Sequence, residues 1–453
     1  MSTAVQTLPA ALATAPAGRA LRFLTAGSVD DGKSTLIGRL LFDSQSLLAD
    51  QVDTLTRRAA GAAPAAGGPA FDLSLLTDGL EAEREQGITI DVAFRYFATP
   101  RRKFIIADAP GHEQYTRNMV TAAAGSDAAV VLVDVTKIDL ATQPVQPIQL
   151  LPQTRRHALL AHLLRVPSLV FAVNKLDAVA DPGPAFAAVR DALLAFAAEA
   201  GMTVAAIVPV SALRGDNVAT PLNADWHAGP SLLQVLERLP AGPPDSAHGL
   251  RLPVQYVARA GSGTGEQPRT LWGRVAQGRV AVGDEVQVFP SGERAVVVGL
   301  RNSDGDTGSV GSGMSAGVVL DRQVDVSRGD WLGAPGLLQP MLRVAATLAW
   351  LDTEPATPGR KYLLRHGHRW VQARLAHVQA RLDIHSLQAA PAESLAVNEI
   401  GEVVFELQQA LPLAPYALNA QAGSLIVVDP ASHRTSGALL VRGDAGTGTG
   451  AGS

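Results

Sequence analysis

The segment from Gly27 to Ser34 reads GSVDDGKS, and it decides the fold of the first half of the chain. It follows an apolar run, Leu21 to Ala26, and precedes a segment whose apolar residues recur at helical spacing. A strand, a Gly-x-x-x-x-Gly-Lys-Ser loop and a helix form a phosphate loop. We expect Lys33 to contact the β- and γ-phosphates and Ser34 to bind Mg²⁺. The predicted nucleotide-binding residues are Gly27, Ser28, Val29, Asp30, Asp31, Gly32, Lys33, Ser34 and Thr35.

A second motif, DAPGH, lies at the end of the apolar run Phe104 to Ala107. An aspartate at its first position holds Mg²⁺ through water, and the glycine N–H reaches the γ-phosphate without a Cβ in the way. The histidine orients the attacking water, because phosphoryl transfer depends mainly on positioning and charge neutralisation. A lone histidine is more often a surface residue, so only the motif favours this interpretation. The motif residues are Asp108, Ala109, Pro110, Gly111 and His112.

The segment EREQGITI at residues 83–90 precedes a predicted strand, Val92 to Phe97. We expect Thr89 to offer its hydroxyl to Mg²⁺ and its N–H to the γ-phosphate, so that loss of the phosphate releases this segment. By composition it is only a charged turn, and its place between the other motifs favours a switch. The predicted catalytic residues are His112, Lys33 and Thr89, and the predicted Mg²⁺ ligands are Ser34, Thr89 and, through water, Asp108.

A base-reading motif, Asn174-Lys175-Leu176-Asp177, follows the apolar run Ser168 to Val173. The Asp177 carboxylate accepts hydrogen bonds from guanine N1–H and from the 2-amino group, and adenine offers neither donor. The nucleotide is therefore predicted to be GTP. We expect Asn174 to tie this loop to the phosphate loop, Lys175 to lie over the base, and a backbone N–H of Ser211, Ala212 or Leu213 to meet guanine O6. A near-match at residues 136–139, TKID, lacks the asparagine, and we reject it.

Composition limits the remaining function classes. A length of 453 residues predicts about two to four domains, and no apolar run reaches the ~18–20 residues that span a bilayer. The net charge of −4 provides no general attraction to nucleic acid. The sequence has no cysteine, which excludes disulfides and thiolate metal sites. Since residues 1–20 lack a secretory signal, we expect a cytoplasmic protein without membrane or nucleic-acid partners.

The pattern of apolar residues in the sequence changes after Pro240. Apolar runs alternate with helical segments before it, which predicts an α/β domain with a mostly parallel sheet and helices on both faces. Short β-branched runs broken by glycine follow it, including Val254 to Val257, and predict two all-β barrels. The predicted divisions are a disordered tail at 1–20, a GTPase domain at 21–243, barrels at 250–340 and 341–442, and a disordered tail at 443–453.

Two histidines, His366 and His368, alternate along a predicted strand of the second barrel. No further histidine or carboxylate has a fixed spacing that completes a metal site. We therefore expect both side chains on the barrel surface.

With these motifs the chain resembles the translation-factor class of GTPases. Elongation factors typically read GHVDHGKT in the phosphate loop, whereas the longer segments here resemble the large, GTPase subunit of bacterial sulfate adenylyltransferase. The resemblance covers about Leu21 to Val441 and is most specific before residue 240. It rests on GSVDDGKSTLIGRLLFDS (27–44), DGLEAEREQGITIDVAFRYF (78–97), PGHEQYTRNMVTAA (110–123), QTRRH (153–157) and SALRGDNV (211–218).

The resemblance implies that GTP hydrolysis drives adenylyl transfer from ATP to sulfate, with Mg²⁺ as cofactor and a separate small subunit that carries the transfer site. The assembly would be a heterodimer or a multiple of it. The chain departs from the family at Ala109, where a threonine is usual, and in an insertion at residues 135–152 that we expect to form a long loop. Since the sequence contains one phosphate loop and ends after the second barrel, no adenylylsulfate kinase domain is expected.

Two alternatives stay open. One is an elongation-type factor that delivers a charged tRNA, against which Asp31 and the lack of a basic stripe on the barrels both argue. The other is a degenerate relative that binds GTP and couples it to nothing.

Overall fold

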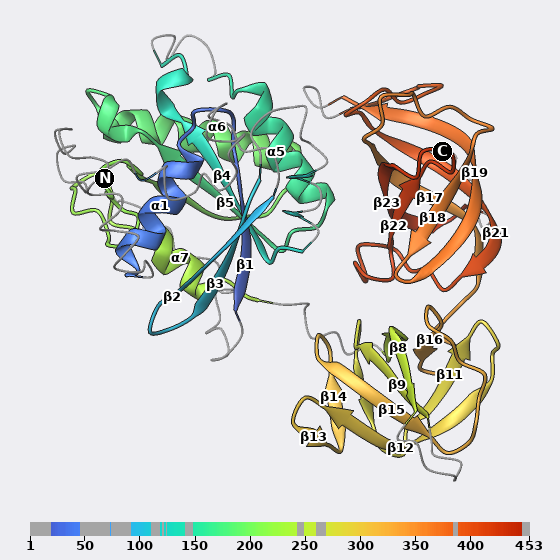
Figure 1. Cartoon of the computed structure of the whole chain (residues 1–453). Coiled ribbons are helices and arrows are strands. Elements are labelled where there is room, and N and C mark those ends of the chain that lie inside the picture. Colours follow the sequence, from blue (N-terminus) through green and yellow to red (C-terminus); the bar gives the residue numbers. More distant parts are fainter. Residues whose placement is uncertain are drawn as a thin grey trace. The chain divides into compact units, whose positions relative to one another are not determined.

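The computed structural model describes residues 20–45, 73, 92–109, 118–119, 122–123, 125–140, 148–241, 249–259, 269–383 and 388–445. The chain divides into two compact units, with the main boundary between Gly242 and Pro243 (Figure 1). The described residues leave out residues 1–19 of the predicted tail at 1–20, the switch segment with Thr89, residues 110–112, and residues 446–453 of the predicted tail at 443–453.

The first unit is built on one mixed sheet with the strand order β2-β3-β1-β4-β5-β6. Neighbouring strands from β3 to β6 pair in parallel, and β2 pairs with β3 in the antiparallel sense at one edge. The central strands are apolar on both faces, as expected where helices cover a parallel sheet. The strands are β1 (Leu21–Ala26), β2 (Ala93–Ala98), β3 (Lys103–Asp108), β4 (Ala128–Asp134), β5 (Ser168–Asn174) and β6 (Val204–Pro209).

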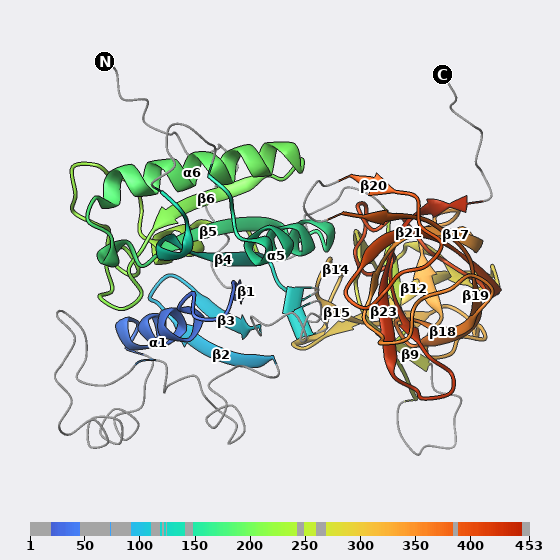
Figure 2. The same cartoon turned by 90° about the horizontal axis from the view of Figure 1, so that it is seen from above.

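Helices cover both faces of this sheet. Apolar residues of α1 (Lys33–Asp43) and α7 (Leu232–Arg238) share one core with alternate sheet residues such as Phe23 and Val130. On the other face α5 (Pro152–Leu163) packs on β4 and β5, and α6 (Pro182–Glu199) packs on β6 (Figure 2). The predicted α/β class is confirmed.

The second unit contains two sets of antiparallel strands. In the first set the order is β7-β16-β11-β12-β15-β9-β8, β13 pairs with β12, and β10 pairs with β14. Its strands are β7 (Arg251–Pro253), β8 (Tyr256–Arg259), β9 (Arg269–Arg274), β10 (Arg279–Ala281), β11 (Glu285–Phe289), β12 (Arg294–Asn302), β13 (Gly305–Asp306), β14 (Ser309–Gly311), β15 (Ser315–Leu320) and β16 (Trp331–Gly333). The prediction of a single strand from Val254 to Val257 is wrong, because β7 ends at Pro253 and β8 begins only at Tyr256.

The second set closes on itself. Its order is β18-β22-β23-β17-β21-β19-β20, and an additional pairing of β18 with β19 joins the two sides into a barrel. Its strands are β17 (Met341–Trp350), β18 (Lys361–His366), β19 (Arg369–Leu382), β20 (Ala389–Ala390), β21 (Ile400–Leu411), β22 (Ser424–Val428) and β23 (Thr435–Asp444). The expected β-barrel architecture is confirmed.

The two strand sets of the second unit meet at a packed interface. The ring of Trp331 on β16 stacks on the ring of His366 on β18, with centroids 5.1 Å apart and planes 5° apart. An ion pair joins Asp330 to Arg369 over 3.2 Å beside this stack, and Asn419 donates a hydrogen bond to the carbonyl of Ala276. The surface position expected for His366 is wrong: its side chain is fully buried because the other strand set covers it.

Burial has a clear effect on His366. Burial lowers its pKa to about 4, although backbone groups of Ala422 and Gln421 beside the ring act in the opposite direction. The histidine is therefore neutral near pH 7.

Among the described helices, none combines the length and the apolar composition needed to cross a membrane.

Candidate nucleotide site

Five candidate site segments follow or end strands of the first unit, and the sheet topology brings them to one edge. Carboxyl ends of adjacent parallel strands meet at the same edge, where open α/β sheets bind ligands. The phosphate loop follows β1, Asp108 ends β3, Asp134 ends β4, Asn174 ends β5 and Ser211 follows β6. Residues more than 170 positions apart in the sequence thereby become neighbours, such as Arg39 and Leu213. We call this edge the carboxyl edge.

The phosphate loop turns sharply into α1 at Gly32, which has a left-handed φ of 91°. A Cβ at this position would come within 2.5 Å of the Asn174 side-chain nitrogen. Only glycine supplies both the backbone conformation and the close approach. The second glycine of the motif is thus required by the position of the base-reading loop as well as by the turn.

Lys33 lies folded over its own loop. Its Nζ donates hydrogen bonds to the carbonyl oxygens of Gly27 and Ser28 over 3.0 and 2.8 Å. Burial lowers the pKa of Lys33, and the carboxylates of Asp108 and Asp31 oppose this effect. The ammonium group lies among carbonyl oxygens at the mouth of the loop, which is the region where a phosphate would sit.

Asp108 lies beside the phosphate loop at the end of β3. Its Oδ1 accepts a hydrogen bond from the hydroxyl of Thr25 over 3.1 Å, and the two residues are also register partners in the sheet. Both side chains are buried. Of the same motif, Ala109 is described and buried, whereas Pro110, Gly111 and His112 lie outside the described residues.

Asn174 contacts both loops beside it. Its Nδ2 donates a hydrogen bond to the carbonyl oxygen of Asp31 over 2.8 Å, and its Oδ1 accepts one from the N–H of Ala212 over 3.0 Å. One buried amide therefore holds together the phosphate loop and the segment Ser211 to Leu213. The structure brings these three predicted segments into direct contact.

Lys175 and Asp177 follow in a short 3₁₀ turn, Leu176–Ala178. Lys175 has a left-handed φ of 64°, and its ammonium pairs with Asp134 Oδ2 over 2.8 Å. Burial alone raises the pKa of Asp134, but Lys175 and hydrogen bonds from Thr136 lower it overall. Asp177 is held more loosely, since its nearest cation is the half-exposed Arg214 at 3.8 Å. Among the residues that the structure describes, none makes a hydrogen bond to this carboxylate that would compete with a base.

Sequence reasoning missed Arg39, which holds the base-side segment in place. This side chain of α1 is almost fully buried, and its Nε donates a hydrogen bond to the carbonyl of Ala212 over 3.3 Å. The guanidinium also bonds the carbonyl of Leu213 and pairs with Asp43 over 3.5 Å. A signal was present in the sequence: Arg39 is a charge among apolar residues of the helix, between Ile37 and Leu40.

Sequence reasoning also passed over Lys137. The insertion at residues 135–152 was expected to form a long loop, but it begins as a 3₁₀ turn, Val135–Lys137, directly after β4. Lys137 Nζ donates hydrogen bonds to Asp31 Oδ1 over 2.8 Å and to the carbonyl of Val29 over 2.6 Å. The near-match TKID thus contributes a side chain to the phosphate loop, although not to a base-reading motif. Residues 141–147 of the insertion lie outside the described residues.

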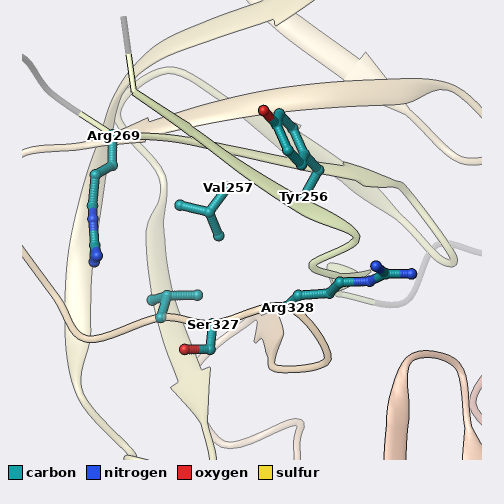
Figure 3. Close-up of a pocket in the computed structure, with 6 residues that line it drawn as sticks. Tyr256, Val257, Arg269, Ser327 and Arg328 are labelled. Atoms are coloured by element: carbon teal, nitrogen blue, oxygen red, sulfur yellow. The ribbon is translucent and has the colours of Figure 1, made fainter.

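A hollow of about 520 Å³ lies in the second unit, which contains none of these motifs (Figure 3). Tyr256, Val257, Arg269, Val326, Ser327 and Arg328 line it. Figure 3 shows Arg328 pointing away from Arg269, so the two guanidinium groups do not converge on one ligand. The hollow does not have the arrangement of charges that an anion site needs.

The carboxyl edge has the parts of a nucleotide switch. A glycine turn and the N-terminus of α1 provide backbone donors for phosphate, and Lys33 provides a cation. Among the residues that the structure describes, no group of three or more histidine, aspartate or glutamate side chains gathers as a metal cluster. The oxygen groups that could hold a metal here are the hydroxyl of Ser34 and the Asp108 carboxylate. Hard oxygen donors of this kind suit Mg²⁺, which usually keeps several waters and binds to phosphate oxygens.

Comparisons with known proteins agree with this arrangement. The family model described as "Elongation factor Tu GTP binding domain" matches residues 18–241, and the model described as "GTP-eEF1A C-terminal domain-like" matches residues 343–442. The first match spans every motif named above. The chain therefore contains a GTP-binding domain of the elongation-factor class.

Three relatives align with almost the whole chain. Sulfate adenylyltransferase subunit 1 of Laribacter hongkongensis is 41% identical over 93% of this chain and 85% of its own length. The subunit 1 of Salmonella newport is 42% identical over the same shares. The bifunctional enzyme NodQ of Azospirillum brasilense is 46% identical over 93% of this chain and 66% of its own length. The chain thus spans about two thirds of the bifunctional relative.

Proposed function

We propose that this chain, which belongs to the family of sulfate adenylyltransferase subunit 1, hydrolyses GTP to drive adenylyl transfer from ATP to sulfate. The products are adenosine 5′-phosphosulfate and pyrophosphate. One observation carries the proposal: relatives named for this subunit align over 85% of their length with a chain whose nucleotide motifs share one edge of a sheet. The transfer is strongly uphill, so coupling to GTP hydrolysis makes chemical sense.

The phosphate loop binds the β- and γ-phosphates of GTP in this proposal. Lys33 moves its ammonium from the carbonyls of Gly27 and Ser28 to the phosphate oxygens, which are stronger acceptors for a cation. The backbone N–H groups that precede α1 supply the remaining donors. The two hydrogen bonds now made by Lys33 support this role, because they hold the cation at the mouth of the loop.

When bound, Mg²⁺ would supply charge neutralisation for the phosphates. Ser34 would hold it directly, Asp108 through water, and Thr89 directly from the segment outside the described residues. The hydrogen bond from Thr25 fixes the Asp108 carboxylate toward the phosphate loop, which supports its part in the set. His112 orients the attacking water in the same proposal, and Gly111 offers its N–H to the γ-phosphate.

Asp177 selects guanine. Its carboxylate accepts hydrogen bonds from N1–H and the 2-amino group, while Lys175 lies along the base and a backbone N–H of the segment Ser211 to Leu213 meets O6. The ties made by Asn174 and Arg39 support this role, since both hold that segment beside the loop of Asp177. Rigid placement is what lets two hydrogen bonds discriminate between bases.

The adenylyl-transfer site belongs to a small partner subunit, and we assign no ATP or sulfate residue to this chain. The complex is a heterodimer or a multiple of one, and it works in the cytoplasm, where its reaction consumes ATP and GTP. We propose a GTPase domain at residues 21–243 and barrels at 250–340 and 341–442. Neither nucleic acid nor a membrane takes part.

The experiment that tests this function mixes the purified chain with its small subunit, ATP, sulfate and Mg²⁺, and follows formation of adenosine 5′-phosphosulfate. We expect product with GTP and little with GDP or without guanine nucleotide. Equal product formation in all three mixtures would contradict the proposal.

Two parallel assays address the alternatives. Binding of aminoacyl-tRNA in the presence of GTP would favour an elongation-type factor, and we expect none. GTP turnover that stays unchanged when the small subunit and its substrates are added would favour a relative that couples GTP to nothing, and we expect a rise.

A further inference from the structure

We propose that Lys137 is a positioning residue for nucleotide binding: it neutralises the buried Asp31 carboxylate and holds the phosphate loop in its binding shape. The proposal rests on the proposed GTP site. It assigns a role to the start of the 135–152 insertion, which the nucleotide motifs leave without one.

The carboxylate of Asp31 lies inside the phosphate loop, where both of its oxygens accept hydrogen bonds. The side chain has no solvent exposure, and its Oδ2 accepts a hydrogen bond from the N–H of Ser28 over 2.6 Å. The other oxygen, Oδ1, accepts one from Lys137 Nζ over 2.8 Å. The same ammonium bonds the carbonyl of Val29. Lys137 therefore fastens the loop at two of its residues from outside the loop.

The charge of Lys137 matters because the proposed ligand of the phosphate loop, a guanine nucleotide, carries several negative charges. A buried carboxylate beside the phosphates would repel them, and the repulsion is strong where water is excluded. Lys137 cancels that charge while Lys33 stays available for the phosphates. Asp31 is buried, whereas the Lys137 side chain is 34% exposed. Removing the lysine leaves the buried carboxylate without its compensating charge, which costs more than the pair contributes. Loss of Lys137 should therefore weaken nucleotide binding, and loss of the Asp31 charge should undo the damage.

Asp134 explains how Lys137 is placed. Its Oδ1 accepts hydrogen bonds from the backbone N–H and the hydroxyl of Thr136, which starts the 3₁₀ turn that carries Lys137. Its Oδ2 pairs with Lys175 of the base-reading loop. One buried carboxylate thus orients a lysine on each side, and a row of alternating charges, Lys175, Asp134, Lys137 and Asp31, runs from the base-reading loop to the phosphate loop.

The test measures the affinity of the full chain for a fluorescent GDP. Variants are Lys137→Met, Lys137→Arg, Asp31→Asn and the double variant of Lys137→Met with Asp31→Asn. Lys103→Met is the control, because Lys103 is an exposed lysine at the opposite end of β3. We expect Lys137→Met to weaken GDP binding at least about tenfold, Lys137→Arg to stay within about threefold of wild type, and Lys103→Met to change nothing.

The double variant separates positioning from simple destabilisation. Once Asp31 is neutral, Lys137→Met should cost less than about threefold, so the double variant should bind like Asp31→Asn alone. The ratio of GDP to IDP affinity should stay at its wild-type value in all variants, because Asp177 is untouched. If Lys137→Met does not fold, the comparison of the double variant with Asp31→Asn still decides.

Two results overturn the proposal: wild-type affinity in Lys137→Met, or a tenfold or larger loss when Lys137→Met is added to Asp31→Asn. Failure of the proposed GTP site has a different signature, since wild type would then bind adenine and guanine nucleotides equally or neither of them. Failure of the proposed coupling shows only in the assays with the small subunit and leaves these binding results unchanged.

Discussion

Asn174 donates a hydrogen bond from its side-chain amide to the carbonyl oxygen of Asp31 over 2.8 Å. The loop after β5 is thereby fastened to the loop after β1, across 143 residues of sequence. Because the same amide accepts from Ala212, a single side chain sets the spacing between the phosphate-binding and base-binding halves of the site. The account of guanine binding depends on this spacing.

Asn174→Ala should weaken GTP and GDP binding about tenfold. The substitution leaves the carbonyl of Asp31 and the N–H of Ala212 without their buried partner, at a cost of about 1–3 kcal/mol. Calorimetric titration with GDP measures the loss. Asn223→Ala, at an exposed position of the same unit, is the matched control and should bind as wild type does. Undiminished affinity in Asn174→Ala would show that the two loops hold their spacing without this bond.

Asp177→Asn should shift the base preference from guanine to xanthine. The amide of asparagine offers a donor to the 2-oxo group of xanthine, whereas the carboxylate accepts from the 2-amino group of guanine. Competition of GDP and XDP against a fluorescent nucleotide measures the shift, with Asp225→Asn as an exposed control. An unaltered preference for GDP would remove Asp177 from the base-reading role.

His112→Ala should slow GTP hydrolysis by about 10²-fold or more. GTP affinity should change little, because His112 orients the attacking water in the transition state and does not hold the bound nucleotide. Single-turnover phosphate release measures the rate, and a separate titration measures binding. His377→Ala, on the exposed face of β19, should hydrolyse GTP at the wild-type rate. A His112→Ala rate equal to wild type contradicts the assignment.

The buried His366 should make the second unit sensitive to acid. Burial lowers its pKa from 6.5 to about 4, so between these values the unfolded chain binds a proton that the folded chain does not. The free energy of unfolding therefore falls as pH drops from 6.5 to 4, and this contribution stays constant above and below that window. His366→Phe keeps a ring against Trp331 and removes the titration.

Denaturant unfolding followed by tryptophan fluorescence tests this expectation. When the pH is lowered from 7.5 to 5, the free energy of unfolding of wild type should fall by about 2 kcal/mol more than that of His366→Phe. The free energy of unfolding of the exposed control His377→Phe should fall over the same range by as much as that of wild type. A wild-type pH dependence in His366→Phe would mean that His366 is not the titrating group.

The sequence reveals those parts of the site whose residues are consecutive. Gly32 and Lys33 are adjacent, Asn174 and Asp177 lie three positions apart, and each motif ends a strand, so the parallel sheet brings them together by topology. The α/β class and the barrels follow from periodicity in the same way. The domain boundaries and the roles of the site residues remain predictions.

The parts that the sequence could not reveal depend on partners far away in the chain. Lys137 acts on Asp31 across 106 residues, and Arg39 acts on Ala212 across 173 residues. His366 is buried only because another strand set supplies Trp331. The charge of Arg39 among apolar helix residues indicates a special position, but no local pattern identifies the partners in such contacts, since they are formed by packing between elements.

The most direct measurement of the central claim is the ratio of pyrophosphate released to GTP hydrolysed by the complex with the small subunit, in ATP and sulfate. The account predicts that the two products accumulate in a constant ratio, and that Asp177→Asn transfers this dependence from GTP to XTP. Pyrophosphate release that continues unchanged when GTP is omitted would contradict it.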